Sequence, residues 1–266
     1  AWRHHARSAV AYFSGDPATF RSELELAVEQ FDLAGDARTS TNDRVNLGFV
    51  LITLGELERA EQLLLQVLAA ATRLGLETVK TYSRHNLGLV RLWLGDPAGS
   101  VDYQRIAVSQ AVEQGEAILE GSARAYLSLA LVALGDLDAA LAEASLSKGL
   151  LEAVPGLLPL AVAAIAHALL ALGRIQEACE QSAHAAALLE TKGCPEDTEA
   201  LVHVTWAQAN LRAGNEDKAR EIVAAAQTAL HERADALGDD VVRTSFLTRV
   251  PAHAQTIALA KQLGVM

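Results

Sequence analysis

The sequence has few of the residues on which most other fold classes depend. Only 2 of its 266 residues are cysteine, 6 are proline, and aromatic residues make up 5%. Two cysteines, Cys179 and Cys194, are too few for a disulfide framework. Long β-branched runs with a period of two are missing as well. Alanine and leucine dominate instead, so the composition predicts an all-α protein.

Positive charge and long apolar runs are also scarce. The net charge is −11, which would repel a phosphate backbone, so we expect no nucleic-acid partner. No apolar run approaches the roughly 20 residues that cross a bilayer, and we expect no membrane insertion. The start, Ala1 to His5, is not a signal peptide, which favours a cytoplasmic location. Because an initiator Met is lacking, we expect a longer parent protein.

A glycine that can end one helix, followed by a residue that can start the next, recurs about every 40 residues. These pairs are Gly15-Asp16, Gly55-Glu56, Gly95-Asp96, Gly135-Asp136, Gly173-Arg174 and Gly214-Asn215. The spacing predicts six helix-turn-helix units in one repeat domain, at about 1–37, 38–76, 77–116, 117–156, 157–195 and 196–237. A helical cap, about 238–266, should follow and cover the last unit. Between the first two units we expect a polar loop from Gly35 to about Thr39.

Small residues occur at fixed distances from each turn glycine. Seven residues before it stand Ser8, Gly48, Gly88, Ser128, Ala166 and Ala207, all of them small. Five residues after it stand Phe20, Ala60, Ser100, Ala140, Ala178 and Ala219, five of which are small. Helices whose axes approach closely need small residues at the crossing. The pattern therefore predicts that both helices of every unit cross at the same place.

This pattern of small residues and turn glycines resembles the tetratricopeptide repeat over nearly the whole chain. The resemblance implies a right-handed α-solenoid of about six TPR-like helix pairs with a C-terminal helical cap. The unit departs from the family in length, since the usual repeat has about 34 residues. The aromatic residue near position four of the usual unit is also replaced, by Arg44, Arg84 and Arg124.

Several short sequence segments resemble the C-terminal repeat region of large bacterial serine/threonine kinases that also carry an AAA-type ATPase segment. They include Arg44–Gly48, His85–Leu89 and, most specific of all, the phrase Ser245-Phe246-Leu247-x-x-Val250-Pro251. The resemblance implies the regulatory arm of a signalling protein. This chain has no Gly-rich phosphate loop, HRD or DFG of its own, so we expect no enzyme activity from it.

Polar and apolar residues recur on the first helices and form the candidate binding site. Arg44, Arg84 and Arg124 recur every 40 residues, as do Asn46 and Asn86. They would either grip the carboxylates or backbone of a partner or form structural pairs within the array. The remaining candidates are expected on the concave face or in packing between repeats, and they are Asn42, Phe49, Tyr82, His85, Leu89 and Trp93.

The sequence therefore predicts a protein–protein interaction or scaffolding module that receives a protein or peptide on its concave face. The alternative is an effector-binding receptor domain that recognises a small molecule or a signal peptide in the same groove. No set of acid and base residues indicates catalysis. Cysteine and histidine residues are too scattered to predict a metal site, and no cofactor is expected.

Overall fold

The computed structural model describes residues 1–13, 16–192 and 196–265. Ser14, Gly15 and Cys194 lie outside the described residues, so the first predicted turn and one cysteine are not assessed. In the described part of the chain the fold is all-helical, as predicted. Its helices are α1 (Trp2–Phe13), α2 (Pro17–Leu33), α3 (Ala37–Thr53), α4 (Leu57–Leu74), α5 (Glu77–Trp93), α6 (Pro97–Gln114), α7 (Ala117–Leu134), α8 (Leu137–Leu151), α9 (Leu158–Ala171), α10 (Ile175–Lys192), α11 (Glu196–Arg212), α12 (Glu216–Ala236), α13 (Asp240–Arg249) and α14 (Pro251–Leu263).

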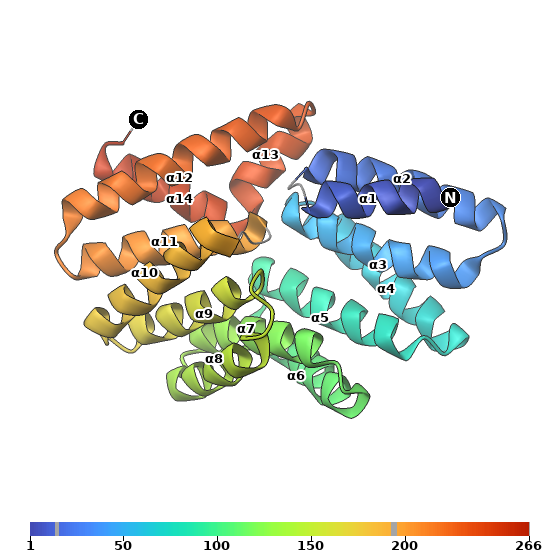
Figure 1. The fold of residues 1–266 in the computed structure, drawn as a ribbon, viewed down its shortest axis with the longest axis horizontal. Helices are drawn as coiled ribbons and strands as arrows, with labels where there is room; N and C mark the ends of the chain where they lie inside the picture. The colour runs from blue at the N-terminus through green and yellow to red at the C-terminus, as the bar shows by residue number, and fades with distance from the viewer. Residues whose placement is uncertain (14–15, 193–195, 266) are drawn as a thin grey trace.

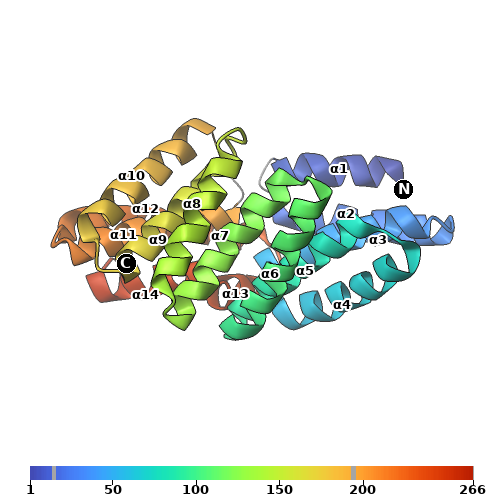
Figure 2. The same cartoon turned by 90° about the horizontal axis from the view of Figure 1, so that it is seen from below.

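The helices form antiparallel pairs that stack into a curved solenoid (Figure 1). In that view α5, α7 and α9 lie toward the inside of the curve, and α6 and α8 lie toward the outside. Figure 2 shows the same array from below, with α7 and α8 in the middle and the N-terminal pairs extending to one side. These three helices, each the first of its pair, therefore contribute to the concave face, as the repeat pattern predicts.

The turn between α5 and α6 shows how the local sequence ends one helix and begins the next. Gly95 adopts a φ of 83°, a left-handed conformation that glycine reaches without a steric cost. Asp96 then caps α6, because its Oδ1 accepts a hydrogen bond of 2.9 Å from the Gly99 backbone N–H. Pro97 occupies the first turn of the helix, where no backbone N–H is needed.

Small residues do lie where the two helices of a unit cross. A Cβ atom added to Gly48 would lie 2.5 Å from Leu64 Cδ2, and one added to Gly88 would lie 2.7 Å from Gln104 Nε2. The repeat is so regular that residues 62–70, 102–110 and 142–150 show the same pattern of burial. At these two crossings a side chain of the second helix therefore fills the space that the glycine leaves.

The predicted loop after Gly35 is wrong, because α3 already begins at Ala37. Asp36 is its N-cap and accepts a hydrogen bond of 3.1 Å from the Thr39 backbone N–H. The run of polar residues from Arg38 to Asn42 looked like a loop by composition. An acidic N-cap and the packing of the later apolar residues are enough to make it helical.

The C-terminal pair does more than cover the last unit. Helix α14 packs on α11 and α12, whereas α13 reaches the turn between α3 and α4, almost two hundred residues earlier in the chain. Phe246 is fully buried there in one cluster with Val50 and Leu54. The Ser245 backbone carbonyl lies directly against Gly55, and Arg249 forms a bidentate ion pair with Glu58 at 2.5 and 2.6 Å. The array therefore closes on itself.

A substitution at Ala140 tests the packing at the helix crossings. It is fully buried between α7 and α8, as Ala60 and Ser100 are in the preceding units. We expect Ala140→Leu to overpack the crossing and to lower the free energy of unfolding by about 1–3 kcal/mol. The midpoint of urea denaturation measures this. The same change at exposed Ala142 on α8 is the control, and equal midpoints for both variants would contradict the register.

A substitution at Phe246 tests whether α13 docks on the turn between α3 and α4. We expect Phe246→Ala to lower the free energy of unfolding by about 3–5 kcal/mol, because it removes a fully buried aromatic ring. Arg249→Ala should cost less than about 1 kcal/mol, since its ion pair with Glu58 is exposed. Denaturation midpoints give both values. A midpoint unchanged by Phe246→Ala would mean that α13 is not docked in solution.

Candidate functional site

A cavity of about 410 Å³ opens on the concave face of the array. Its size is within the range of ligand pockets, roughly 300–1,000 Å³. It is lined from units one to six by His5, Ser8, Ala9, Tyr12, Phe20, Val45, Asn46, Phe49, Tyr82, His85, Asn86, Ile118, Leu119, Ser122, Tyr126, Leu157, Leu160 and Thr198.

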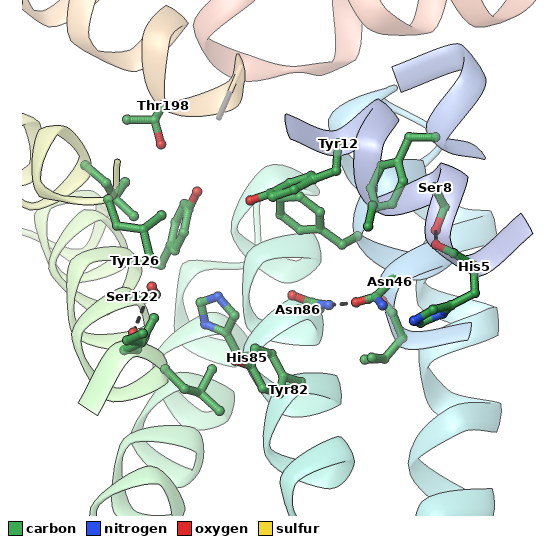
Figure 3. A pocket seen from close by; sticks show the side chains of 18 residues that line it. His5, Ser8, Tyr12, Asn46, Tyr82, His85, Asn86, Ser122, Tyr126 and Thr198 are labelled. Carbon is green, nitrogen blue, oxygen red and sulfur yellow. Dashed lines mark hydrogen bonds between the residues drawn. The ribbon is translucent and has the colours of Figure 1, made fainter. Parts of the chain in front are cut away.

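Aromatic rings gather at this cavity although aromatics are rare in the chain. Five of the 9 Phe and Tyr residues line it. Tyr12 packs with its ring centroid 5.4 Å from that of Phe20 and 6.5 Å from that of Phe49. On the opposite side Tyr126 lies 5.6 Å from the His85 ring, and Figure 3 shows Tyr12 and Tyr126 facing one another across the cavity. The cavity thus has two aromatic walls.

His85 lies on the floor of the cavity and is held by Gln104 of α6. The Gln104 amide donates through Nε2 to the His85 backbone carbonyl at 3.0 Å, and its Oε1 lies 3.0 Å from His85 Nδ1. Because Oε1 can only accept, Nδ1 must carry the proton, which leaves Nε2 as an acceptor. Burial lowers the pKa of His85 to about 4, so the ring is neutral at pH 7.

A second histidine, His5, pairs with a buried carboxylate. Its Nδ1 lies 2.8 Å from Asp43 Oδ1, and the Asp43 side chain is fully buried. Burial raises the pKa of Asp43, and the neighbouring His5 partly offsets this. Ser8 lies close by, but its hydroxyl donates to the His5 backbone carbonyl at 2.7 Å and not to the ring. Serine, histidine and aspartate therefore do not form the linked triad that nucleophilic catalysis requires.

No Lys, Arg, Asp or Glu is among the cavity's lining residues that the structure describes. Burial raises the pKa of Tyr82, and the negative charge of Glu116, which is not a lining residue, raises it further. Asn86 donates through Nδ2 to the Val45 carbonyl at 3.4 Å, which links α5 to α3 and leaves its Oδ1 as an acceptor (Figure 3).

The three recurring arginines form structural pairs and do not line the cavity. Arg44 bonds to Asp32 at 2.5 Å, and Arg84 donates to Gln110 Oε1 at 2.7 Å. Arg124 bonds to Glu120 at 2.8 Å and to Glu143 at 2.6 Å. Of the two roles that the sequence left open for these arginines, the structure shows the one within the array.

The other predicted site residues separate into three groups. Asn46, Phe49, Tyr82, His85 and Asn86 line the cavity together. Trp93 lies further along the concave face in a second, smaller chamber, and Asn42 is exposed on α3 outside both. Leu89 is fully buried in the main core, because its position on α5 faces the neighbouring helices. Of the two placements that the sequence left open for it, Leu89 takes the one in packing.

Several lining residues were not among the predicted site residues. Tyr126 stands 40 residues after Asn86 and 80 after Asn46, so the repeat period alone could have identified it. His5, Ser8 and Tyr12 come from α1, and Thr198 comes from α11. They reach the cavity only because the array curves, and no pattern in the sequence reports that curvature.

Two further features bear on function. Among the described residues no group of three or more His, Cys, Asp or Glu is placed to hold a metal ion. Helix α7 is long and apolar enough to cross a membrane by length and composition, but half of the 18-residue segment is buried inside the solenoid. A core helix of a repeat array meets the same criterion.

The lowered pKa of His85 predicts a pH dependence. The unfolded chain, with a pKa near 6.5, binds more protons than the folded chain between pH 6.5 and 4, so stability falls as the pH falls through that window. From pH 7 to pH 5 the loss due to His85 should be about 2 kcal/mol. We expect His85→Gln to reduce this slope, measured by urea denaturation at both pH values. An equal slope in variant and parent would contradict the buried neutral ring.

No model of a protein family matches the sequence, and no curated protein matches it. Solved structures do match. A Rap protein in complex with the Competence and Sporulation Factor has a TM-score of 0.68 at 15% identity, over 98% of this chain and 75% of that one. The Rap conjugation gene regulator of the plasmid pLS20, in complex with the Phr* peptide, has a TM-score of 0.65 at 13% identity, over 97% and 73%.

TPR-like repeats of a putative kinesin light chain from Podosopora anserina match with a TM-score of 0.52 at 18% identity, over 70% of this chain and 92% of that one. Identities this low show the fold and nothing more. The chain therefore has the fold of a TPR-like helical solenoid.

Proposed function

We propose that this chain is a peptide-binding module and that the cavity on its concave face receives the peptide. The observation that carries the proposal is the gathering of five aromatic rings and several uncharged hydrogen-bonding groups around a cavity of about 410 Å³. Exposed apolar surface of this kind marks binding sites. The proposed function is thus a protein-interaction function. The concave shape and limited volume of the cavity suit a short peptide segment better than a large protein surface.

The hydrogen-bonding groups of the cavity suit a peptide backbone. His85 Nε2 and Asn86 Oδ1 are acceptors for backbone N–H groups, and Asn46 offers both a donor and an acceptor. Thr198 faces them from the far side of the cavity (Figure 3). Buried polar groups on a peptide need such partners, since each one left unpaired costs about 1–3 kcal/mol.

The comparisons support this choice over the scaffolding alternative. One Rap protein was solved in complex with the Competence and Sporulation Factor, and another in complex with the Phr* peptide. Both share the fold of this chain over nearly its whole length. A receptor that recognises a signal peptide in its groove is therefore favoured over a scaffold that binds a large flat protein surface.

We further propose that the module is a regulatory arm of a bacterial cytoplasmic signalling protein linked to a kinase. This step rests on the resemblance of the sequence phrases alone. Reading the encoding gene upstream of Ala1 tests it. Kinase and ATPase segments in the same reading frame would support the link, and a start codon directly upstream would contradict it.

Blocking the cavity tests the proposed peptide site. Ser122 lines the cavity, and its hydroxyl donates to the Ile118 carbonyl one turn earlier. Ser145, on the outer helix α8, makes the equivalent bond to Leu141 and is exposed. Peptides are selected on the parent chain from a random displayed library. We expect Ser122→Trp to weaken their binding at least tenfold and Ser145→Trp to leave it unchanged.

Isothermal titration calorimetry with each purified variant gives the affinities. Thermal melting checks that both variants remain folded. Equal affinities for the Ser122→Trp and Ser145→Trp variants would place peptide binding elsewhere on the surface and overturn the proposal.

A further inference from the structure

A second chamber lies beside the cavity on the concave face. It has a volume of about 200 Å³ and lies between α5, α7, α9, α11 and the first turn of α14. Its walls include Trp93, Tyr126, Leu129, His167 and Val204. Tyr126 also lines the larger cavity, so its side chain borders both spaces. Nothing in the peptide site described above uses the chamber.

The chamber is apolar except at a few positions, of which His167 of α9 is the most constrained. Its Nδ1 is buried and has no hydrogen-bond partner in the part of the chain that the structure describes. Burial lowers the pKa of His167, so its ring is neutral at pH 7. Nε2 is not among the buried unpaired atoms, so it is the nitrogen that remains accessible to a ligand. Such a ring offers one hydrogen bond and no charge.

The size and walls of the chamber define what could fill it. A dry cavity of about 150 Å³ is large enough to hold a benzene ring. Rings of Trp93, Tyr126 and His167 provide edges and faces for aromatic packing, which is worth about 0.5–1.5 kcal/mol for each pair beyond burial. None of the described lining residues is Lys, Arg, Asp or Glu, so a charged group would enter without a counter-charge.

We propose that this chamber is a specificity pocket for a tyrosine or tryptophan side chain of the peptide bound in the larger cavity. The ring packs against Trp93 and Tyr126. Its hydroxyl or indole N–H donates to His167 Nε2, which accepts in the tautomer that carries the ring proton on Nδ1. This inference rests on the proposed peptide-binding function, because the peptide brings the side chain to the chamber past Tyr126. The chamber itself can be tested without any peptide.

The first experiment uses side-chain analogues on the intact chain. p-Cresol represents tyrosine, toluene lacks its hydroxyl, and 4-methylbenzoate carries a charge. The readout is the indole N–H signal of Trp93 in NMR spectra, identified with Trp93→Phe. We expect p-cresol to shift this signal saturably, toluene to bind at least threefold more weakly, and 4-methylbenzoate to cause no shift. A Trp93 signal that p-cresol does not move overturns the proposal.

Two variants locate the binding and test its hydrogen bond. Ala133 is an exposed residue on the rim of the chamber, so Ala133→Trp should block entry without disturbing the core, and Ala142→Trp on exposed α8 is its control. We expect Ala133→Trp to abolish the shift and Ala142→Trp to keep it. His167→Phe should remove the preference for p-cresol over toluene. A preference that survives His167→Phe overturns the role of the imidazole.

The second experiment separates this inference from the peptide site. Peptides selected on the parent chain should share a Tyr or Trp at one position, and selection on the Ala133→Trp variant should lose that preference while peptides still bind. Selected peptides without a shared aromatic residue would overturn the specificity pocket and leave the peptide site standing. Binding of p-cresol without any selectable peptide would overturn both the peptide assignment and the proposed function.

Discussion

The structure depends on one steric constraint, the close approach of two helices within each repeat. Gly48 and Gly88 leave room for Leu64 and Gln104, and a methyl group at either glycine would collide with those side chains. Because the same approach recurs every 40 residues, each unit is rotated by a similar amount from the last, and the array curves. The concave face, and therefore both cavities, are consequences of this crossing repeated along the chain.

Closure of the curve adds part of the wall of the smaller chamber. The C-terminal helices return to the turn between α3 and α4, where Phe246 is buried and Arg249 pairs with Glu58. Immediately after this contact, Pro251 and Ala252 line the smaller chamber. The segment Ser245–Pro251, which most strongly suggested a kinase-linked protein, thus has a structural role of its own. It joins the two ends of the solenoid and supplies part of its inner wall.

The repeated helix pairs could be predicted from the sequence. The residues that the curvature of the array brings together could not. Turn glycines and small residues at fixed spacing gave the helix pairs, and five predicted residues, among them Asn46 and His85, do line the cavity. Whether Leu89 faces the groove or the core depends on a rotation of its helix that the spacing does not report. Tyr12 and Thr198 come from units far apart in the sequence, so only the superhelix could reveal them.

Gln104 shows how one residue of a repeat can both fill a helix crossing and orient a side chain that lines the cavity. At its position in the neighbouring units stand Leu64 and Ala144, which only fill the crossing. Gln104 fills it too, but its amide also fixes the proton of His85 on Nδ1 and leaves Nε2 free to accept. In a chain with a net charge of −11, this provides a neutral acceptor where a carboxylate would repel anionic ligands. Selectivity in such a site comes from shape and hydrogen bonds, because neither wall offers a charge to attract or exclude a partner.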